Sequence, residues 1–305
     1  MGEMTDRLKV AFALLAVCVI WGSTYFAMRV GLESLPPFMM GSLRFLIAGV
    51  AMYAVLRARG ERAPTRRQWG SAALTGALLL VVGNGAVAFG QQRVSSSVAA
   101  IVVATMPLWA VLFGRLFGDR ASRLELVGVG IGFVGVALLH AGGDLFSYGA
   151  SAFAMLLAPA GWALGSVWSR RLPLPGGLMS TAAQMLTGGA MMGVVSFATG
   201  EHLDALANVS MRSVLAVAYL ALFGSIIAFS AYGYLLRHAR TSTATSYAYV
   251  NPLIALGIGV VLGGERVHAA TLAGAGVILG GVLVLSLARS SNATDRASSR
   301  PEARA

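Results

Sequence analysis

The sequence has few charged side chains and one cysteine. Only 11% of its 305 residues are Asp, Glu, Lys or Arg, whereas 57% are hydrophobic. A water-soluble domain carries about 25% charged residues, so this composition indicates an integral membrane protein. Because Cys18 is the one cysteine, no intramolecular disulfide can form.

Acidic and histidine side chains are also absent from the middle of the long apolar runs. The 12 Asp and Glu residues and the four His residues fall at the ends of these runs or between them. A proton relay therefore lacks its usual intramembrane groups, and hydrolysis at membrane depth lacks a base or a metal site. We predict no enzyme activity, no cofactor and no metal. Facilitated diffusion or exchange is favoured over tightly proton-coupled antiport.

The apolar runs are long enough to cross a membrane as helices. A helix needs about 20 apolar residues to cross about 30 Å of hydrocarbon, and these runs are too long and continuous for barrel strands. The first run has a basic start like a signal peptide, but its length indicates an uncleaved anchor. The predicted fold is an all-α integral membrane protein with ten transmembrane helices, near residues 9–30, 38–56, 70–90, 95–117, 124–141, 150–169, 177–198, 211–235, 241–262 and 268–288.

The basic residues predict the orientation, because Lys and Arg concentrate in cytoplasmic loops. With the N-terminus inside, the opposite face holds only Arg29, Arg93, Arg212 and Arg266, and Arg44 alone lies within a span. All the other Lys and Arg residues fall on the cytoplasmic face, so both termini are predicted to be cytoplasmic. This topology and attraction to anionic lipid account for the net charge of +11. We therefore predict the lipid bilayer as a partner, and no nucleic acid.

The chain repeats itself. LVGVGIGFVGVALL from Leu126 aligns with LAGAGVILGGVLVL from Leu272, and MPL at 106–108 corresponds to NPL at 251–253. Each half has five predicted helices, an odd number, so the second half enters the membrane from the other side. Such an inverted repeat predicts alternating-access transport. The predicted organisation is a cytoplasmic N-terminus (1–8), a first repeat (9–141), a second repeat (150–288) and a disordered cytoplasmic tail (289–305).

Several motifs, in order, carry a family resemblance. They are WGSTYFAMRVG from Trp21, RFLIAG from Arg44, VVATMPL, FGDR, YLALFGSIIAFSAYGYL, TSYAYVNPL and GGER. The chain resembles the EamA branch of the drug/metabolite transporter superfamily, and within it the YedA-like inner-membrane transporters. The resemblance implies a central cavity and export of amino acids, related metabolites or drugs. The Arg-rich composition, with Lys9 as the one lysine, is typical of a GC-rich bacterial genome, so a bacterial inner membrane is the expected location.

Polar and aromatic residues form stripes on otherwise apolar spans. Residues three, four and seven positions apart share one face of a helix, and such stripes disfavour lipid. Each single residue could instead form an interhelical hydrogen bond or place an aromatic ring at the membrane interface. Four stripes together predict a shared cavity for a small-molecule substrate, with walls and polar contacts from Trp21, Tyr25, Asn84, Gln91, Trp162, Ser166, Tyr247 and Asn251.

Three further residues stand out within the spans. Pro107 and Pro252 occupy matching places in the two halves, and each removes a helical hydrogen bond, so we predict that they bend their helices at the cavity. The alternative is a passive kink without a role in the cavity. Arg44 is a costly cation in a span, so it should reach the outer rim, bond backbone carbonyls or meet an anionic group of the cargo.

A glycine pattern in the fifth span has two interpretations. Residues 130–135 read GIGFVG, which formally matches a dinucleotide fingerprint, but they follow no strand and lie within a span. We interpret them, with Gly274, Gly276, Gly280 and Gly281 in the other half, as a seam of small residues that packs two helices. The substrate, its direction, the coupling ion and the oligomeric state are left open by the sequence, and a passive channel stays as an alternative.

Overall fold

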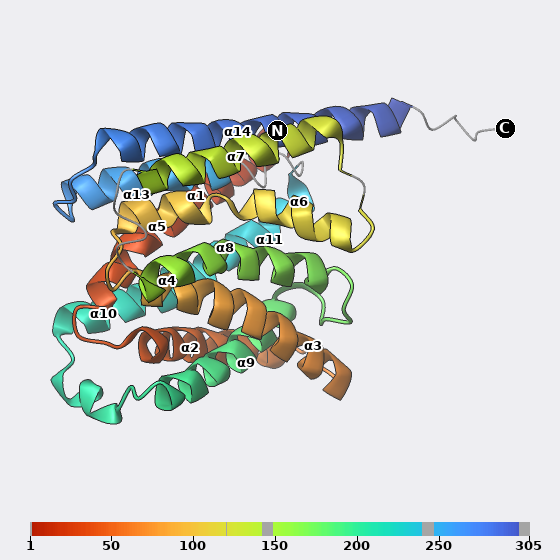
Figure 1. Cartoon of the computed structure of the whole chain (residues 1–305). Coiled ribbons are helices and arrows are strands. Elements are labelled where there is room, and N and C mark those ends of the chain that lie inside the picture. The colour runs from red at the N-terminus through yellow and green to blue at the C-terminus, as the bar shows by residue number, and fades with distance from the viewer. Residues whose placement is uncertain (1, 120, 142–148, 240–246, 299–305) are drawn as a thin grey trace.

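A computed structural model describes residues 2–119, 121–141, 149–239 and 247–298, and these ranges are helical with short connections. Figure 1 shows the helices side by side, with α7 and α14 at the top and α2, α3 and α9 at the bottom. The helices are α1 (Gly2–Gly31), α2 (Pro37–Ala58), α3 (Arg66–Gly76), the π-helix η1 (Ala77–Gly85), α4 (Ala86–Gly90), α5 (Ser96–Val103), α6 (Met106–Leu116), α7 (Arg123–Ala141), α8 (Ala150–Ser169), α9 (Gly177–Ala198), the 3-10 helix η3 (Leu203–Asn208), α10 (Met211–Tyr219), the π-helix η4 (Leu220–Ile227), α11 (Ala228–His238), α13 (Tyr247–Val261) and α14 (Ala269–Ser298).

Within the described ranges, eight helical segments are long and apolar enough to cross a membrane. The prediction of an all-helical membrane protein is therefore confirmed. The apolar helix α13 has 15 residues, and the start of its predicted span, 241–246, lies outside the described residues. α14 continues to Ser298, so the tail predicted as disordered from residue 289 is helical up to that point. No Gly or Pro interrupts residues 289–298, which explains why the helix can continue.

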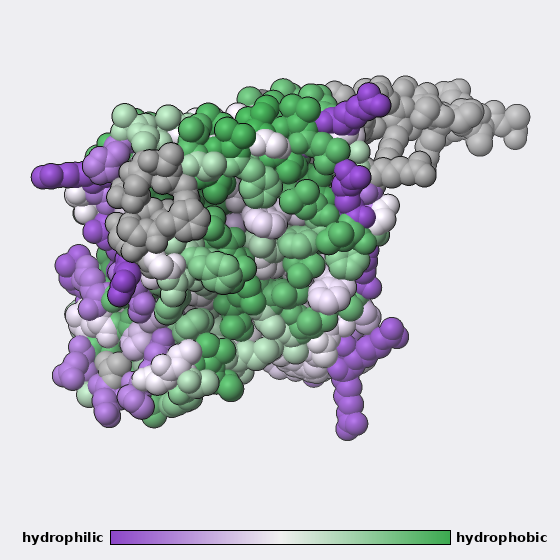
Figure 2. All heavy atoms as spheres, viewed as in Figure 1, coloured by the Kyte–Doolittle hydropathy of each residue, from purple (hydrophilic) through white to green (hydrophobic). Residues whose placement is uncertain are grey.

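The molecular surface carries an apolar band between two hydrophilic ends (Figure 2). Large apolar side chains such as Phe12, Phe153, Val194 and Leu215 are more than half exposed on the outside of the bundle. In water they would cost free energy, but in hydrocarbon they need no partner. The band therefore marks the surface that faces lipid.

The two halves of the sequence share their cores. One buried cluster joins α5, α6 and α8 with α7 and α14, and another joins α2 and η1 with α9 and η4. The glycines of α7 and α14 allow the two helix backbones to approach closely: a Cβ on Gly281 would lie 2.5 Å from the Gly132 nitrogen, and one on Gly135 would lie 2.6 Å from the Ile278 nitrogen. Gly130, Gly276 and Gly280 face open space instead. The packing seam thus uses part of the predicted glycine set.

Some helix starts are capped by side chains, in one case from a distant segment. Thr65 and Gln68 form a capping box at α3, with their hydrogen bonds at 3.3 and 2.9 Å. α2 begins at the Pro36–Pro37 turn, where no local side chain caps it. The Glu201 carboxylate accepts from the Phe38 and Met39 nitrogens at 3.2 and 2.8 Å. A carboxylate is stabilised there by the unpaired N–H groups of the helix, so Glu201 fixes the connection after α9 to the start of α2.

Candidate functional site

A cavity lies among α1, α2, η1, α4, the α5–α6 junction, α8, α11 and α13. The cavity has a volume of about 90 Å³. About 10–15 Å³ admits one water molecule, so this space exceeds the needs of a single water. The wall consists of Trp21, Thr24, Tyr25, Met28, Arg44, Asn84, Val87, Ala100, Val103, Ala104, Met106, Pro107, Trp162, Phe229, Tyr247, Ala248, Asn251 and Pro252.

Trp21 is the centre of an aromatic cluster in this wall. Its ring centroid lies 4.9 Å from that of Tyr247 and 5.3 Å from those of Phe229 and Tyr232, with tilted or edge-on geometry. Its indole Nε1 donates to the Gly224 carbonyl at 3.1 Å. The hydrogen bond and the rings fix the indole, so one face of the wall is a rigid aromatic surface.

Two asparagines supply neutral polar groups. Asn84 lies in η1 and donates from Nδ2 to the Leu79 carbonyl at 3.3 Å. Asn251 lies in α13; with Nδ2 turned toward two carbonyls, it donates to Tyr247 and Cys18 at 3.1 Å each. The second bond crosses to α1. Both amides are therefore held in place at the edge of the cavity.

The prolines lie on the cavity wall. The fourth predicted span is divided there into α5 and α6, and Pro107 is the second residue of α6. Pro252 lies inside α13. Proline has no N–H, so neither ring can donate to the carbonyl four residues earlier. Those carbonyls belong to Val103 and Ala248, which also line the cavity.

Arg44 reaches the cavity rather than the outer rim. Its side chain is buried, Nε donates to the Ser225 hydroxyl at 3.0 Å, and the guanidinium carbon lies 4.7 Å from the Phe45 ring centroid. Within the described part of the chain, no carboxylate forms an ion pair with it. Of the wall residues that the structure describes, it is the one with a charged side chain.

Six of the eight predicted cavity residues lie on this wall, and Gln91 and Ser166 do not. Gln91 follows the end of α4 and donates from Nε2 to the Tyr25 carbonyl at 3.0 Å. Between Asn84 and Gln91 the chain leaves a π-helix, which changes the helical phase on which the predicted stripe relied. Ser166 lies one turn beyond Trp162 along α8, nearer the helix end at Ser169.

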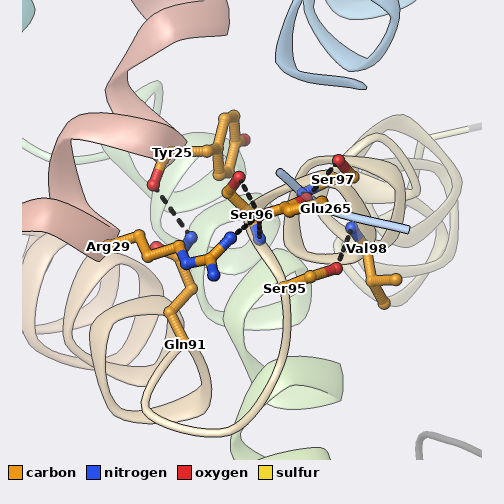
Figure 3. Close-up of polar contacts among 8 residues, drawn as sticks. All are labelled: Tyr25, Arg29, Gln91, Ser95, Ser96, Ser97, Val98 and Glu265. Atoms are coloured by element: carbon orange, nitrogen blue, oxygen red, sulfur yellow. Dashed lines mark hydrogen bonds and ion pairs between the residues drawn. The ribbon is translucent and has the colours of Figure 1, made fainter. Parts of the chain in front are cut away.

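A second group of polar residues, centred on Glu265, lies next to the cavity (Figure 3). Its Oε1 accepts from Arg29 Nη1 at 2.6 Å and from the Ser96 nitrogen and hydroxyl at 2.9 and 2.6 Å. Oε2 accepts from the Ser97 nitrogen at 3.1 Å and from its hydroxyl. Burial raises the pKa of Glu265, but the hydrogen bonds from Ser96 and Ser97 outweigh it, so the pKa is below its ordinary value.

The Glu265 cluster (Glu265, Arg29, Ser96 and Ser97) lies one helical turn beyond the cavity. Arg29 follows Tyr25 by four residues on α1, and Ser96 precedes Ala100 by four residues on α5, and both Tyr25 and Ala100 line the cavity. One turn rises about 5.4 Å. The cluster therefore joins α1, α5 and the connection between α13 and α14 at one end of the cavity.

Several of these features were not predicted. The π-helices η1 and η4 occupy matching places in the two halves and bring Asn84 and the Arg44 partner Ser225 to the site. Phe229 also lines the cavity and was not among the residues predicted from helical spacing. Asp119 of FGDR and Glu265 of GGER both precede an arginine in the sequence. The contacts of Glu265, a residue between spans, depend on tertiary structure.

The helices, the apolar band and the cavity define a multi-spanning membrane protein with a space for a small solute between its helices. The chain belongs to the EamA-like transporter family, whose sequence profile matches residues 8–141 and 149–287. This confirms the resemblance seen in the motifs.

Relatives cover almost the whole chain. The "Uncharacterized inner membrane transporter YedA" of Escherichia coli (strain K12) is 46% identical over 278 residues, covering 91% of this chain and 90% of the relative. The "Probable amino-acid metabolite efflux pump" of Salmonella typhimurium is 25% identical over 301 residues, 90% of this chain and 94% of that protein. The "Probable terminal-alkyne amino-acid exporter" of Streptantibioticus cattleyicolor is 25% identical, covering 91% and 93%.

A solved structure shows the same fold. It is titled "Crystal structure of protein", has a TM-score of 0.63 and is 22% identical in sequence. The match covers 92% of this chain and 98% of that one. The helix arrangement is therefore shared. At this identity the similarity shows the fold alone and says nothing about the substrate.

Proposed function

We propose that this chain is a secondary transporter of amino acids or related small metabolites, an exporter or exchanger in a bacterial inner membrane. The observation that carries the proposal is the cavity, to which helices from both halves contribute. The names of two relatives, an efflux pump and an exporter for amino-acid compounds, support this substrate class. The name of the E. coli relative supports the inner-membrane location.

The wall suits a solute that has both polar and apolar parts. In this proposal the rings of Trp21, Tyr25, Trp162 and Tyr247 make stacking and apolar contacts, while Asn84 and Asn251 orient polar groups. Pro107 and Pro252 have no N–H to donate to the carbonyls of Val103 and Ala248, so in this proposal these carbonyls can accept from an ammonium group. Gln91 and Ser166 lie off this wall, and we propose that Gln91 positions α1 through the Tyr25 carbonyl and that Ser166 takes part in the packing of α8.

The proposed topology has ten spans in two inverted five-helix repeats. Two adjacent family matches, one in each half, support the repeats. In addition to the eight long apolar segments, α7 and α13 would be the fifth and ninth spans. The Arg distribution supports cytoplasmic termini.

We propose alternating access around this cavity. The Glu265 cluster would close the end that the Arg distribution places outside, and it would separate when that end opens. At the matching place in the first half, Asp119 has a different environment: its side chain is 62% exposed and pairs with Arg171 at 3.1 Å. This asymmetry supports a conformation in which the Glu265 cluster holds the outer end of the cavity closed.

The proposed transport is facilitated diffusion or exchange. The part of the cavity wall formed by described residues contains no Asp, Glu or His that could carry a proton. The test is solute uptake into proteoliposomes under a pH gradient, with proton movement followed by a fluorescent indicator. Uphill uptake driven only by that gradient would refute facilitated diffusion or exchange.

Multidrug or other metabolite export with the same fold is the alternative, favoured by the largely apolar wall. A passive channel and an intramembrane enzyme are the rival classes. The substrate panel in the transport assay should therefore contain amino acids, metabolites and drug-like cations.

Cavity variants test the proposal. We expect Trp21→Ala and Asn251→Ala to lower amino-acid transport in proteoliposomes by about tenfold or more, since each removes a fixed contact on the wall. Phe153→Ala, on the lipid-facing surface, is the control and should transport like the parent. If both cavity variants also transport like the parent, the cavity assignment is wrong.

A further inference from the structure

Arg44 has more donors than the protein uses. Its Nε bond to Ser225 takes one N–H, and the guanidinium carbon lies above the Phe45 ring. Among the described residues no acceptor contacts either Nη atom. These atoms are also not among the fully enclosed polar atoms without a partner, so they border the open space of the cavity.

The guanidinium is held in a fixed position. Ser225 and Gly224 belong to η4, and a Cβ on Gly224 would lie 3.3 Å from Arg44 Nη2. The lack of a side chain at Gly224 thus leaves room for the guanidinium, and the Ser225 hydroxyl sets its rotation. A planar donor fixed in this way is suited to a planar oxyanion.

The charge balance of the wall selects the ligand further. Among the described residues of the wall Arg44 is the one charged group, so a solute with one negative group would neutralise it, whereas a dianion would leave a buried negative charge. The remaining wall is aromatic and apolar around Trp21, Trp162 and Tyr247. A solute with a carboxylate at one end and an apolar or aromatic body matches both parts.

We propose that Arg44 is the carboxylate-binding residue of this cavity and that it makes the protein selective for solutes with a single carboxylate. This inference rests on the proposed transport function and names the chemical class of its substrate. Ser225 is a positioning residue, because it acts on the ligand only through Arg44.

Binding of matched probes tests the inference. Trp21 and Trp162 line the cavity, so their fluorescence in protein reconstituted into nanodiscs reports occupancy. The probes are phenylacetate and L-phenylalanine, each against its amide. We expect the parent to prefer each carboxylate by about tenfold or more, because a hydrogen bond to a charged group contributes on this order.

Variants separate recognition from folding. Arg44→Gln should bind each carboxylate and its amide equally, Arg44→Lys should retain part of the preference, and Ser225→Ala should weaken it. Arg212→Gln, an exposed residue that pairs with Glu33, is the matched control and should keep the full preference. Arg44→Gln should also unfold at no lower temperature than the parent, because an unpaired buried cation is costly when the cavity is empty.

The outcomes are distinct. Equal affinity of the parent for carboxylates and amides, or a preference that survives in Arg44→Gln, overturns the Arg44 assignment. A large loss of thermal stability in Arg44→Gln, with the carboxylate preference intact in Arg44→Lys and Ser225→Ala, points to a structural role instead. Absence of saturable transport for the whole substrate panel contradicts the proposed function itself, whatever the binding preference.

Discussion

Replacing Glu265 by Gln measures how strongly the Glu265 cluster holds its end of the bundle. The change keeps the size of the side chain but removes its charge and turns one acceptor oxygen into a donor. Breaking a buried ion pair costs about 3–5 kcal/mol, and a hydrogen bond to a charged group contributes about 1.5–3 kcal/mol. Arg29 is 41% exposed and can be hydrated, and Gln keeps one acceptor, so we expect a loss of about 2–3 kcal/mol at this site.

Amide hydrogen exchange reads this loss locally. The Ser96 and Ser97 amides donate to Glu265, and the expected loss corresponds to about 30-fold to 150-fold faster exchange if they open locally. Glu33→Gln is the control, because Glu33 pairs with Arg212 on the exposed surface and should change stability by less than about 0.5 kcal/mol. Unchanged exchange at both serines in Glu265→Gln would refute the reasoning.

Three further predictions follow from the same contacts. The lowered pKa of Glu265 means that its stabilisation is present above about pH 4.3, the ordinary value, and is lost as pH falls through the lower folded value; unfolding against pH should show this dependence in the parent and not in Glu265→Gln. Gly281→Ala should destabilise by about 1–3 kcal/mol, since its Cβ would lie 2.5 Å from the Gly132 nitrogen, whereas Gly276→Ala, which meets no neighbour, should not; chemical denaturation in detergent compares them. Trp162→Ala should raise the KM for transport about tenfold while the thermal unfolding temperature stays near that of the parent, and an unchanged KM would remove Trp162 from the proposed site.

Helical spacing grouped residues of the cavity wall that lie one α-helical turn apart. Trp21 and Tyr25 lie on one face of α1, and Tyr247 and Asn251 lie on one face of α13, so helical spacing was sufficient to group them. Gln91 lies off the cavity wall, and the π-helix η1 precedes it within the same predicted span. A π-turn adds a residue to one turn, and a regular α-helix rotates about 100° per residue, so positions after it move to another face. No composition signal marked η1.

Contacts between distant segments were the other feature that the sequence could not predict. Arg44 was predicted to be in a span, but its position beside Ser225 depends on how α2 packs against η4. Glu265 was predicted to lie between spans, as it does, but its burial against Ser96 and Ser97 is a tertiary contact. Spacing along the chain predicts which residues share a face of a helix, and it does not predict which helix that face meets.

Counterflow in proteoliposomes tests the central claim, carrier transport through this cavity, most directly. Vesicles are loaded with unlabelled amino acids, metabolites or drug-like solutes, and the entry of a trace of the same labelled solute is followed, with Trp162→Ala as the comparison. The account predicts a saturable, transient accumulation of label above equilibrium for an amino acid or related metabolite, and its weakening in Trp162→Ala. Entry that rises linearly with concentration and never exceeds equilibrium would indicate a channel and contradict the account.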